Sequence, residues 1–176
     1  EEILDSTTKT SKSDYITNQN QVSIKDVLEQ CVKRHHKDAS KKGIALNYSA
    51  HEQVLYGSPQ SLIRILDNLL SNAIRYTQDG NIDLQTRNHE GLIEIQVVDT
   101  GRGIPPSTIN RLLDPYQQSG TLVEENEGYG LGLYIVKTLC EKSNYKLTIE
   151  SQLGKGSCFS IILDEAYEKT SNVQPS

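Results

Sequence analysis

The stretch that decides the fold reads Leu92-Ile93-Glu94-Ile95-Gln96-Val97-Val98-Asp99-Thr100-Gly101-Arg102-Gly103. Its first seven residues alternate, which predicts a strand with Ile93, Ile95 and Val97 on one face. Asp99 is in phase with these three side chains, so we expect its carboxylate on the covered side of the sheet. A buried carboxylate without a partner is costly, and the glycines that follow suit a tight turn or the close approach of a ligand. The stretch therefore predicts a ligand that donates a hydrogen bond to Asp99.

The Asp-Thr-Gly triplet at 99–101 has two other interpretations. It can be a turn that ends a strand. It is also the triplet of aspartic proteases, which are all-β and pair two carboxylates across a dimer or repeat. Helix-forming segments on both sides of the triplet argue against a protease.

Composition narrows the class of protein. The chain has 176 residues, of which 35% are hydrophobic, so we expect one domain plus some solvated tail. A net charge of −5 and a pI near 5.4 argue against a nucleic-acid-binding surface. No apolar run approaches membrane-spanning length, and no signal peptide is visible. Three cysteines without metal-ligand spacing are predicted to be free thiols, namely Cys31, Cys140 and Cys158.

The periodicities predict an α+β fold with helices on one side of a mixed or antiparallel sheet. Helices are expected over residues 23–42, 58–77, 105–113 and 129–143. Strands are expected over residues 44–48, 81–87, 92–98, 146–150 and 157–163. Turns at 88–91 and 153–156 make two hairpins. Residues 1–21 suggest the end of a helix and a linker, and the chain from about Glu168 suggests a disordered tail.

The predicted helix at 58–77 carries amides on the side opposite its apolar stripe. Asn68 and Asn72 lie four residues apart, and Arg75 follows three residues later. Amide oxygens suit magnesium, and a guanidinium suits phosphate oxygens. This face could therefore hold a metal–phosphate group, although an ordinary polar surface is the alternative.

Glycines recur at every second position in Gly128-Tyr129-Gly130-Leu131-Gly132-Leu133, just ahead of a predicted helix. Such a segment can leave backbone N–H groups free for phosphate at the helix N-terminus. The spacing is neither the dinucleotide fingerprint nor a Walker A sequence, and a flexible loop is the usual meaning of a lone glycine repeat. Gly154-Lys155-Gly156-Ser157 most simply makes a hairpin turn.

The order of these segments resembles the ATP-binding catalytic domain of sensor histidine kinases, in the superfamily that also contains gyrase, the ninety-kilodalton heat-shock chaperones and mismatch-repair ATPases. Residues 68–77 resemble its N box, 99–105 its G1 box and 128–133 its G2 box, and 151–159 match its usual ending. The resemblance covers about residues 22–164. It implies a Bergerat-type two-layer α/β sandwich, with a mixed, mostly antiparallel sheet of about five strands packed on three helices.

The resemblance also implies site roles. Asp99 would accept a hydrogen bond from the adenine amino group, while Asn68 and Asn72 would hold Mg²⁺ and the phosphates of ATP. Catalytic roles would fall to Asn68, Asn72 and Arg75, and residues 107–127 would form a lid. The implied nucleotide-binding set is Asn68, Asn72, Arg75, Tyr76, Asp99, Gly101, Gly103, Ile104, Gly128, Tyr129, Gly130, Leu131, Gly132 and Leu133.

The sequence departs from the family pattern at three places. Leu112-Leu113-Asp114-Pro115-Tyr116 stands where the F box usually has phenylalanines, and Leu113 and Tyr116 could fill the same packing role. Ser58 replaces an acidic residue ahead of the N box. Ser143-Asn144-Tyr145 replaces a His-Gly-Gly turn. None of these changes removes an implied nucleotide ligand.

Asn68 separates kinase from ATPase, because superfamily ATPases place a water-activating glutamate at this position. We therefore expect slow hydrolysis and a nucleophile from elsewhere, which in the kinases is a histidine on a separate dimerisation hairpin. His35 and His36 lack the phosphoacceptor pattern and are expected to be solvated helix residues. His51 and His89 are expected in loops.

The sequence thus predicts the catalytic domain of a two-component sensor histidine kinase over residues 22–167, between the end of a dimerisation hairpin at 1–21 and a tail at 168–176. It would phosphorylate a histidine of its parent's dimerisation domain, for relay to a response regulator receiver domain. We expect a cytoplasmic monomeric fragment of a homodimeric parent, with no nucleic-acid partner. The alternatives are a regulatory nucleotide-binding module of a non-transferring parent and an anti-sigma-type serine kinase.

Overall fold

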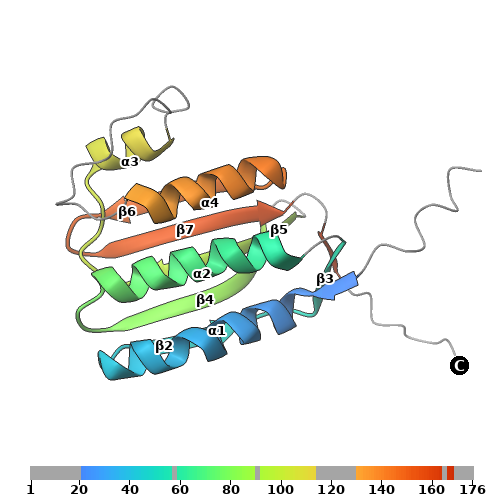
Figure 1. Cartoon of the computed structure of the whole chain (residues 1–176), viewed down its shortest axis with the longest axis horizontal. Coiled ribbons are helices and arrows are strands. Elements are labelled where there is room, and N and C mark those ends of the chain that lie inside the picture. Colours follow the sequence, from blue (N-terminus) through green and yellow to red (C-terminus); the bar gives the residue numbers. More distant parts are fainter. Residues whose placement is uncertain (1–20, 57–58, 90–91, 114–129, 164–165, 169–176) are drawn as a thin grey trace, which may run out of the picture.

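The computed structural model describes residues 21–56, 59–89, 92–113, 130–163 and 166–168 (Figure 1). Along the chain the elements are β1 (Gln21–Ser23), α1 (Ile24–Lys41), β2 (Ala45–Ser49), β3 (Gln53–Tyr56), α2 (Pro59–Tyr76), β4 (Asn81–His89), β5 (Leu92–Asp99), α3 (Pro106–Leu113), α4 (Gly130–Lys142), β6 (Lys146–Gln152), β7 (Gly156–Leu163) and β8 (Ala166–Glu168).

The main sheet has five strands in the order β2-β4-β5-β7-β6. Its β2–β4 pair is parallel and the other pairs are antiparallel. Helices α1, α2 and α4 lie side by side on one face of this sheet (Figure 1). The predicted α+β fold, with a mixed, mostly antiparallel sheet packed on three helices, is confirmed.

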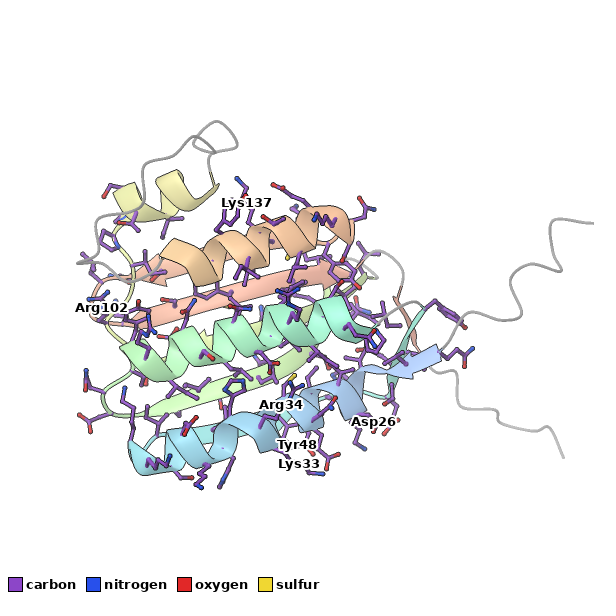
Figure 2. The ribbon with its side chains drawn as sticks, viewed as in Figure 1. Asp26, Lys33, Arg34, Tyr48, Arg102 and Lys137 are labelled. Atoms are coloured by element: carbon purple, nitrogen blue, oxygen red, sulfur yellow. The ribbon has the colours of Figure 1, made fainter. Side chains whose placement is uncertain are left out.

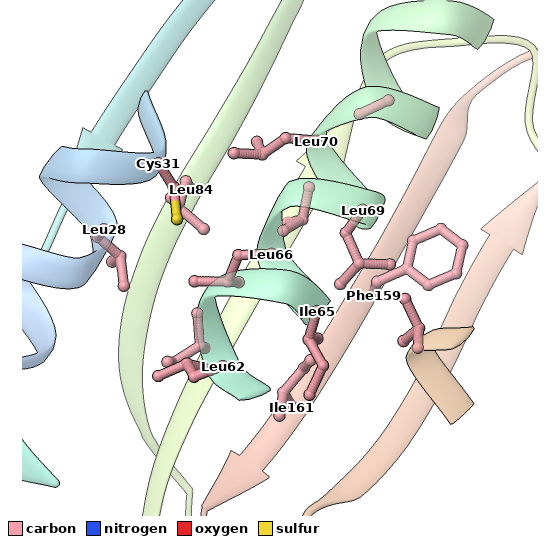
Figure 3. Packing of buried hydrophobic residues seen from close by; sticks show 14 of the residues in the cluster. Leu28, Cys31, Leu62, Ile65, Leu66, Leu69, Leu70, Leu84, Phe159 and Ile161 are labelled. Carbon is pink, nitrogen blue, oxygen red and sulfur yellow. The ribbon is translucent and has the colours of Figure 1, made fainter. Parts of the chain in front are cut away.

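The core forms where the apolar side of α2 meets the sheet and its neighbouring helix. Periodic apolar residues make α2 amphipathic, and each buried leucine or isoleucine stabilises the fold by about 1.5–3 kcal/mol relative to an exposed one. Figure 3 shows the buried side chains of α2 packed between α1 and β7. Its members include Leu28, Cys31, Leu62, Ile65, Leu66, Leu69, Leu70, Leu84, Phe159 and Ile161.

A second, three-stranded antiparallel sheet, β1-β3-β8, was not predicted from the sequence. It pairs Val22 with Leu55, and Val54 with Tyr167. These strands have only three or four residues, too few to show an alternation that stands out from the surrounding polar sequence. Leu55 is 1% exposed and joins β3 to the main core.

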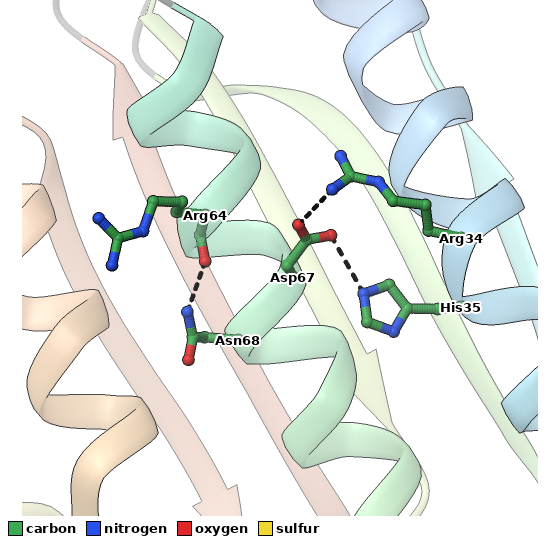
Figure 4. A network of polar contacts seen from close by, with 5 residues as sticks. All are labelled: Arg34, His35, Arg64, Asp67 and Asn68. Atoms are coloured by element: carbon green, nitrogen blue, oxygen red, sulfur yellow. Dashed lines mark hydrogen bonds and ion pairs between the residues drawn. The ribbon is translucent and has the colours of Figure 1, made fainter.

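The histidine predictions need two corrections. His89 is the last residue of β4, in register with Leu92, because strand pairing continues beyond the predicted turn. His35 is not solvated: its side chain is 15% exposed and its Nε2 lies 3.1 Å from Asp67 Oδ1 on α2. Arg34 also binds Asp67, with Nη1 2.7 Å from Oδ2 (Figure 4). His35 lies on the side of α1 that packs on α2, which the sequence pattern did not reveal. His36 is exposed, and His51 lies in a loop, as expected.

All three cysteines are free, as predicted. Burial raises the pKa of the Cys31 and Cys140 thiols to about 12, so neither supplies thiolate at neutral pH. Asn144 takes the turn position after α4 with a φ of 56°, a conformation that asparagine tolerates better than most residues. Among the described residues, no helix combines the length and apolarity needed to cross a bilayer.

Candidate functional site

Asp99 ends β5 on the covered face of the sheet, as the alternation predicts. Its residue is 7% exposed, and the in-phase Ile93, Ile95 and Val97 are between 0% and 2% exposed. In the ladder Asp99 is opposite Ser157, the second residue of β7. The alternation of β5 therefore buries the Asp99 carboxylate beside the beginning of β7.

Two backbone amides face this carboxylate. Gly101 N donates to Asp99 Oδ1 at 2.8 Å, and the backbone amide of Ser157 also donates to the carboxylate. Burial raises the pKa of the Asp99 carboxyl above its ordinary value of 3.8, and the hydrogen bonds from Gly101 and Ser157 oppose this shift. The site thus holds a buried acceptor whose ionised form is only partly compensated by its own backbone.

This environment predicts how stability depends on pH. Because the folded-state pKa of Asp99 is raised, the folded state holds more protons than the unfolded state between pH 3.8 and that raised value. The contribution of Asp99 to the free energy of unfolding is therefore greatest in acid and is lost as the pH rises through the folded pKa. We expect wild type to lose stability relative to Asp99→Asn across this window. Urea unfolding of both proteins at stepped pH measures it, and a pH-independent difference would contradict the burial of the charge.

The turn after Asp99 is packed against other backbone on both sides. A Cβ at Gly101 would lie 2.6 Å from Tyr76 O and 2.9 Å from Asp99 Oδ1. At Gly103, where φ is 71°, a Cβ would lie 2.1 Å from Gln152 O. Of the two explanations offered by the sequence, the tight turn therefore accounts for these glycines without any ligand.

Gly103→Ala is expected to destabilise the fold by about 3 kcal/mol or more. A residue with a Cβ loses about 1–2 kcal/mol in the left-handed region, and here it also meets the Gln152 carbonyl. Gly154→Ala is the matched control, because Gly154 has a φ of 76° but open space within 4 Å of the added Cβ. Urea unfolding compares the variants. Equal losses would show that the contact with Gln152 relaxes without cost.

Asn68 and Asn72 lie where α2 meets α4. Asn68 Nδ2 donates to Arg64 O at 2.7 Å, as Figure 4 shows. The position of a Cβ at Gly132, in the first turn of α4, is 3.4 Å from Asn72 Oδ1 and 3.6 Å from Asn68 Oδ1. Asn72 Nδ2 is nearer still, at 3.3 Å, so the two asparagine amides surround one point that a larger side chain at Gly132 would fill. Both asparagines are half-buried where α2 packs on α4.

The last turn of α2 joins this amide pair to Asp99. Tyr76 is half-buried, and its ring centroid lies 4.6 Å from Arg102 Cζ. Arg102 N also donates to Tyr76 O at 3.2 Å, which fixes the turn after Asp99 to the end of α2. Figure 2 shows Arg102 at this end of the molecule. Arg75 is exposed on the same turn.

A small cavity connects the two halves of the site. It has a volume of about 10 Å³ and is lined by Asn72, Ala73, Tyr76, Asp99, Gly103, Ile104, Ser157 and Phe159. That volume is close to the minimum that holds one water molecule, so a planar base needs the surrounding side chains to move apart. A larger open hollow of about 470 Å³ lies along α1, but none of the predicted site residues lines it.

Sequence reasoning missed Ser151, Ser157 and Phe159. Ser151 Oγ accepts from Ile104 N at 2.8 Å, donates to Gly156 O at 2.9 Å and lies 2.9 Å from Ser157 Oγ. Residues 154–157 were predicted to make a hairpin turn, and 151–159 matched the family's usual ending, but none of them was predicted to be a site residue. The missing signal was the pairing of β5 with β7, which is what brings Ser157 opposite Asp99.

Some of the predicted site residues lie outside the residues that the structure describes. Gly128 and Tyr129, and the lid beyond Leu113, are not among the described residues, while Gly130 and Leu131 begin α4. Ile104 and Leu133 are buried in the core, at 1% and 3% exposure. Among the described residues, Asn72, Tyr76, Asp99, Gly103 and Ile104 meet at one cavity, while Asn68, Gly101 and Gly132 touch its surroundings.

Comparison with known proteins identifies the family of this chain. Residues 57–167 match the family described as Histidine kinase-, DNA gyrase B-, and HSP90-like ATPase. The chain is 42% identical over 108 residues to the sensor histidine kinase RcsC of Escherichia coli (strain K12), covering 61% of this chain and 11% of the relative. It is 37% identical over 105 residues to the histidine protein kinase DivJ of Caulobacter vibrioides, covering 59% and 18%. The chain thus spans less than a fifth of either relative.

Solved structures give the same result for the fold. The full-length ShkA structure in complex with AMPPNP superimposes with a TM-score of 0.71 and 26% identity, over 83% of this chain and 31% of that chain. A nucleotide-free catalytic domain of histidine kinase ThkA gives a TM-score of 0.69 at 17% identity, over 84% and 97%, and supports the fold alone. With its motifs at the α2–β5–α4 junction, the chain belongs to the histidine kinase-, DNA gyrase B- and HSP90-like ATPase family, as an ATP-binding catalytic domain of the sensor histidine kinase type.

Proposed function

We propose that this domain binds Mg-ATP and transfers the γ-phosphoryl group to a histidine on its parent's separate dimerisation domain. The observation that carries this proposal is the buried Asp99 carboxylate, in one cavity with Asn72 of α2 and Tyr76. The phosphoryl group would then pass to the receiver domain of a response regulator. Relatives named as sensor kinases support this assignment.

Adenine recognition is assigned to Asp99. An ionised carboxylate can only accept hydrogen bonds, and the adenine amino group can only donate usefully to it. Gly101 and Ser157 take part of its accepting capacity and leave capacity for a further donor. Tyr76 and Ile104, which line the same cavity, supply apolar surface for the base.

Mg²⁺ is assigned to Asn68 and Asn72. Their amides surround the point beside Gly132, each can present an oxygen there, and oxygen is the ligand atom that this hard cation prefers. The donor set therefore fits magnesium with additional ligands from phosphate and water. The ion would neutralise phosphate charge, which phosphoryl transfer requires.

The residues of this chain would position the reactants and keep hydrolysis slow. Arg75 of α2 is assigned to the phosphates, where a guanidinium can bind two oxygens at once. Asn68 stands where a hydrolytic ATPase needs a base, and an amide cannot take a proton from water. The acceptor histidine then competes for the phosphoryl group without an activated water.

The proposal extends to the arrangement of the whole protein. We infer a catalytic domain over residues 22–167, a hairpin end at 1–21 and a tail at 168–176. The fragment would be monomeric, its parent a cytoplasmically facing homodimer. The nucleotide would be held by the set given above, including Gly128 and Tyr129.

The decisive experiment mixes the chain, Mg-ATP labelled at the γ-phosphate and a separately purified hairpin of its own parent. We expect label on the hairpin that is stable in base and lost in acid, with slow ATP turnover by the chain alone. Rapid turnover that depends on Asn68 would instead indicate an ATPase. Acid-stable label on serine or threonine would indicate an anti-sigma-type kinase, and nucleotide binding without any transfer would indicate a regulatory module.

A further inference from the structure

Lys42 caps a helix to which it does not belong. It follows α1, yet its ammonium reaches the C-terminal end of α2. Lys42 Nζ donates to Ile74 O at 2.6 Å, to Thr77 O at 3.0 Å and to Arg75 O at 3.2 Å. An ammonium has three donors, so these contacts use its full capacity.

The end of α1 fixes where Lys42 lies. Gly43 has a φ of 73°, and Gly43 N donates to Ser40 O while Ile44 N donates to Ala39 O, both at 3.0 Å. This pair of bonds is the Schellman ending of a helix, with Lys42 as its C-cap. Ile44 and Ala39 are buried at 4% and 0% exposure, which completes the motif's apolar contact. The backbone hydrogen bonds of this motif thus fix the position of Lys42 independently of its side-chain contacts.

The end of α2 needs this partner. The last four carbonyls of a helix have no N–H donor within that helix, and together they carry about half a negative charge. Thr77 N satisfies Ala73 O, and Arg102 N satisfies Tyr76 O. Lys42 supplies the donors for the other two carbonyls, at Ile74 and Arg75. Helices α1 and α2 end on the same side of the molecule (Figure 1), which allows the Lys42 ammonium to reach the carbonyls of α2.

We propose that Lys42 is a positioning residue for the nucleotide site. The turn it holds carries Arg75 and Tyr76, and Tyr76 contacts Arg102 and lines the cavity with Asp99. Without the ammonium, this turn would open and carry the tyrosine away from the place of the base. The inference rests on the proposed nucleotide site and adds a residue that acts on it through the end of α2.

The test compares Lys42→Met with Lys41→Met. Lys41 is the neighbouring residue, and its substitution removes the same charge. Its side chain is 64% exposed, and within the part of the chain that the structure describes it pairs with Asp38. At a temperature where circular dichroism shows both variants folded, we expect about tenfold weaker adenosine and ATP binding for Lys42→Met, and no change for Lys41→Met. Hydrogen exchange should accelerate at residues 74–78 while β5 and β7 stay protected.

Conservative variants separate positioning from folding. Lys42→Arg keeps charged donors and should recover most of the affinity. Lys42→Gln keeps an N–H donor but removes the charge and shortens the side chain, and it should not recover the affinity. This order of affinities decides the matter if Lys42→Met does not fold. A merely structural role would lower the melting temperature of Lys42→Gln but leave the affinity of its folded population equal to that of wild type, which would overturn the proposal.

Asp99→Asn, measured in parallel, separates the two levels of inference. If Asp99→Asn binds nucleotide like wild type, the proposed adenine site is wrong. If Asp99→Asn binds weakly while Lys42→Met and Lys41→Met bind alike, the site stands and only the positioning role of Lys42 is wrong.

Discussion

Asn72→Asp is expected to reduce phosphoryl transfer to the parental hairpin by about a hundredfold or more, the scale of losing one electrostatic group at a reaction centre. The amide is half-buried against Gly132, with its Nδ2 3.3 Å from the Cβ position there. A carboxylate in its place adds negative charge, at low solvation, beside the assigned position of the phosphates. Binding of Mg-ATP should weaken far more than binding of adenosine. Calorimetry with each ligand and transfer of labelled phosphate measure the two effects.

Ser71→Asp is the control for this substitution. It adds the same charge one residue earlier on α2, where the side chain is exposed. It should leave adenosine binding, Mg-ATP binding and transfer close to wild type. If Asn72→Asp weakens adenosine and Mg-ATP equally, the substitution acts through the α2–α4 packing, and the assignment of Asn72 to the metal and phosphates fails.

Asp99→Asn is expected to lower the affinity for ATP and ADP by about ten- to a hundredfold, because a hydrogen bond to a charged group is worth about 1.5–3 kcal/mol. The change removes the charge with little change of shape. It also removes the cost of burying that charge, so the chain should remain folded. Isothermal titration calorimetry of wild type and variant provides the comparison.

Asp83→Asn is the matched control for that experiment. Asp83 on β4 also accepts side-chain hydrogen bonds, from Asn47 Nδ2 at 2.9 Å and from Asn81 Nδ2, but it does not line the cavity. The same isosteric loss of charge there should not alter nucleotide affinity. Unchanged binding in Asp99→Asn would remove Asp99 from adenine recognition.

Sequence alone predicted the parts of the fold whose signal is periodic. The alternation of β5 predicted that Asp99 is buried, because a strand's faces follow directly from residue parity. Gly43 likewise marked the end of α1. Boundaries moved by one or two residues where pairing continued, as at β4, which reaches His89.

The remaining features depend on contacts between elements. Ser157 acquires its place beside Asp99 only through the β5–β7 register, and His35 its burial only through the packing of α1 on α2. The half-buried state of Asn72 depends on α4, whose first turn supplies Gly132. The local sequence pattern of one element does not show which distant element will pack against it.

The β1-β3-β8 sheet has a consequence for the order of folding. Its three strands come from residues near 22, 55 and 167, and each pairing joins only three residue pairs. Bringing these distant segments of the chain together costs conformational entropy, and a few backbone hydrogen bonds offset that cost only in part. The sheet should therefore form after the main sheet has already drawn its strands together, and it should be among the first parts to open. The part of the domain formed by β1, β3 and β8 would then exchange with solvent by local opening, while the β5–β7 centre exchanges only through global unfolding.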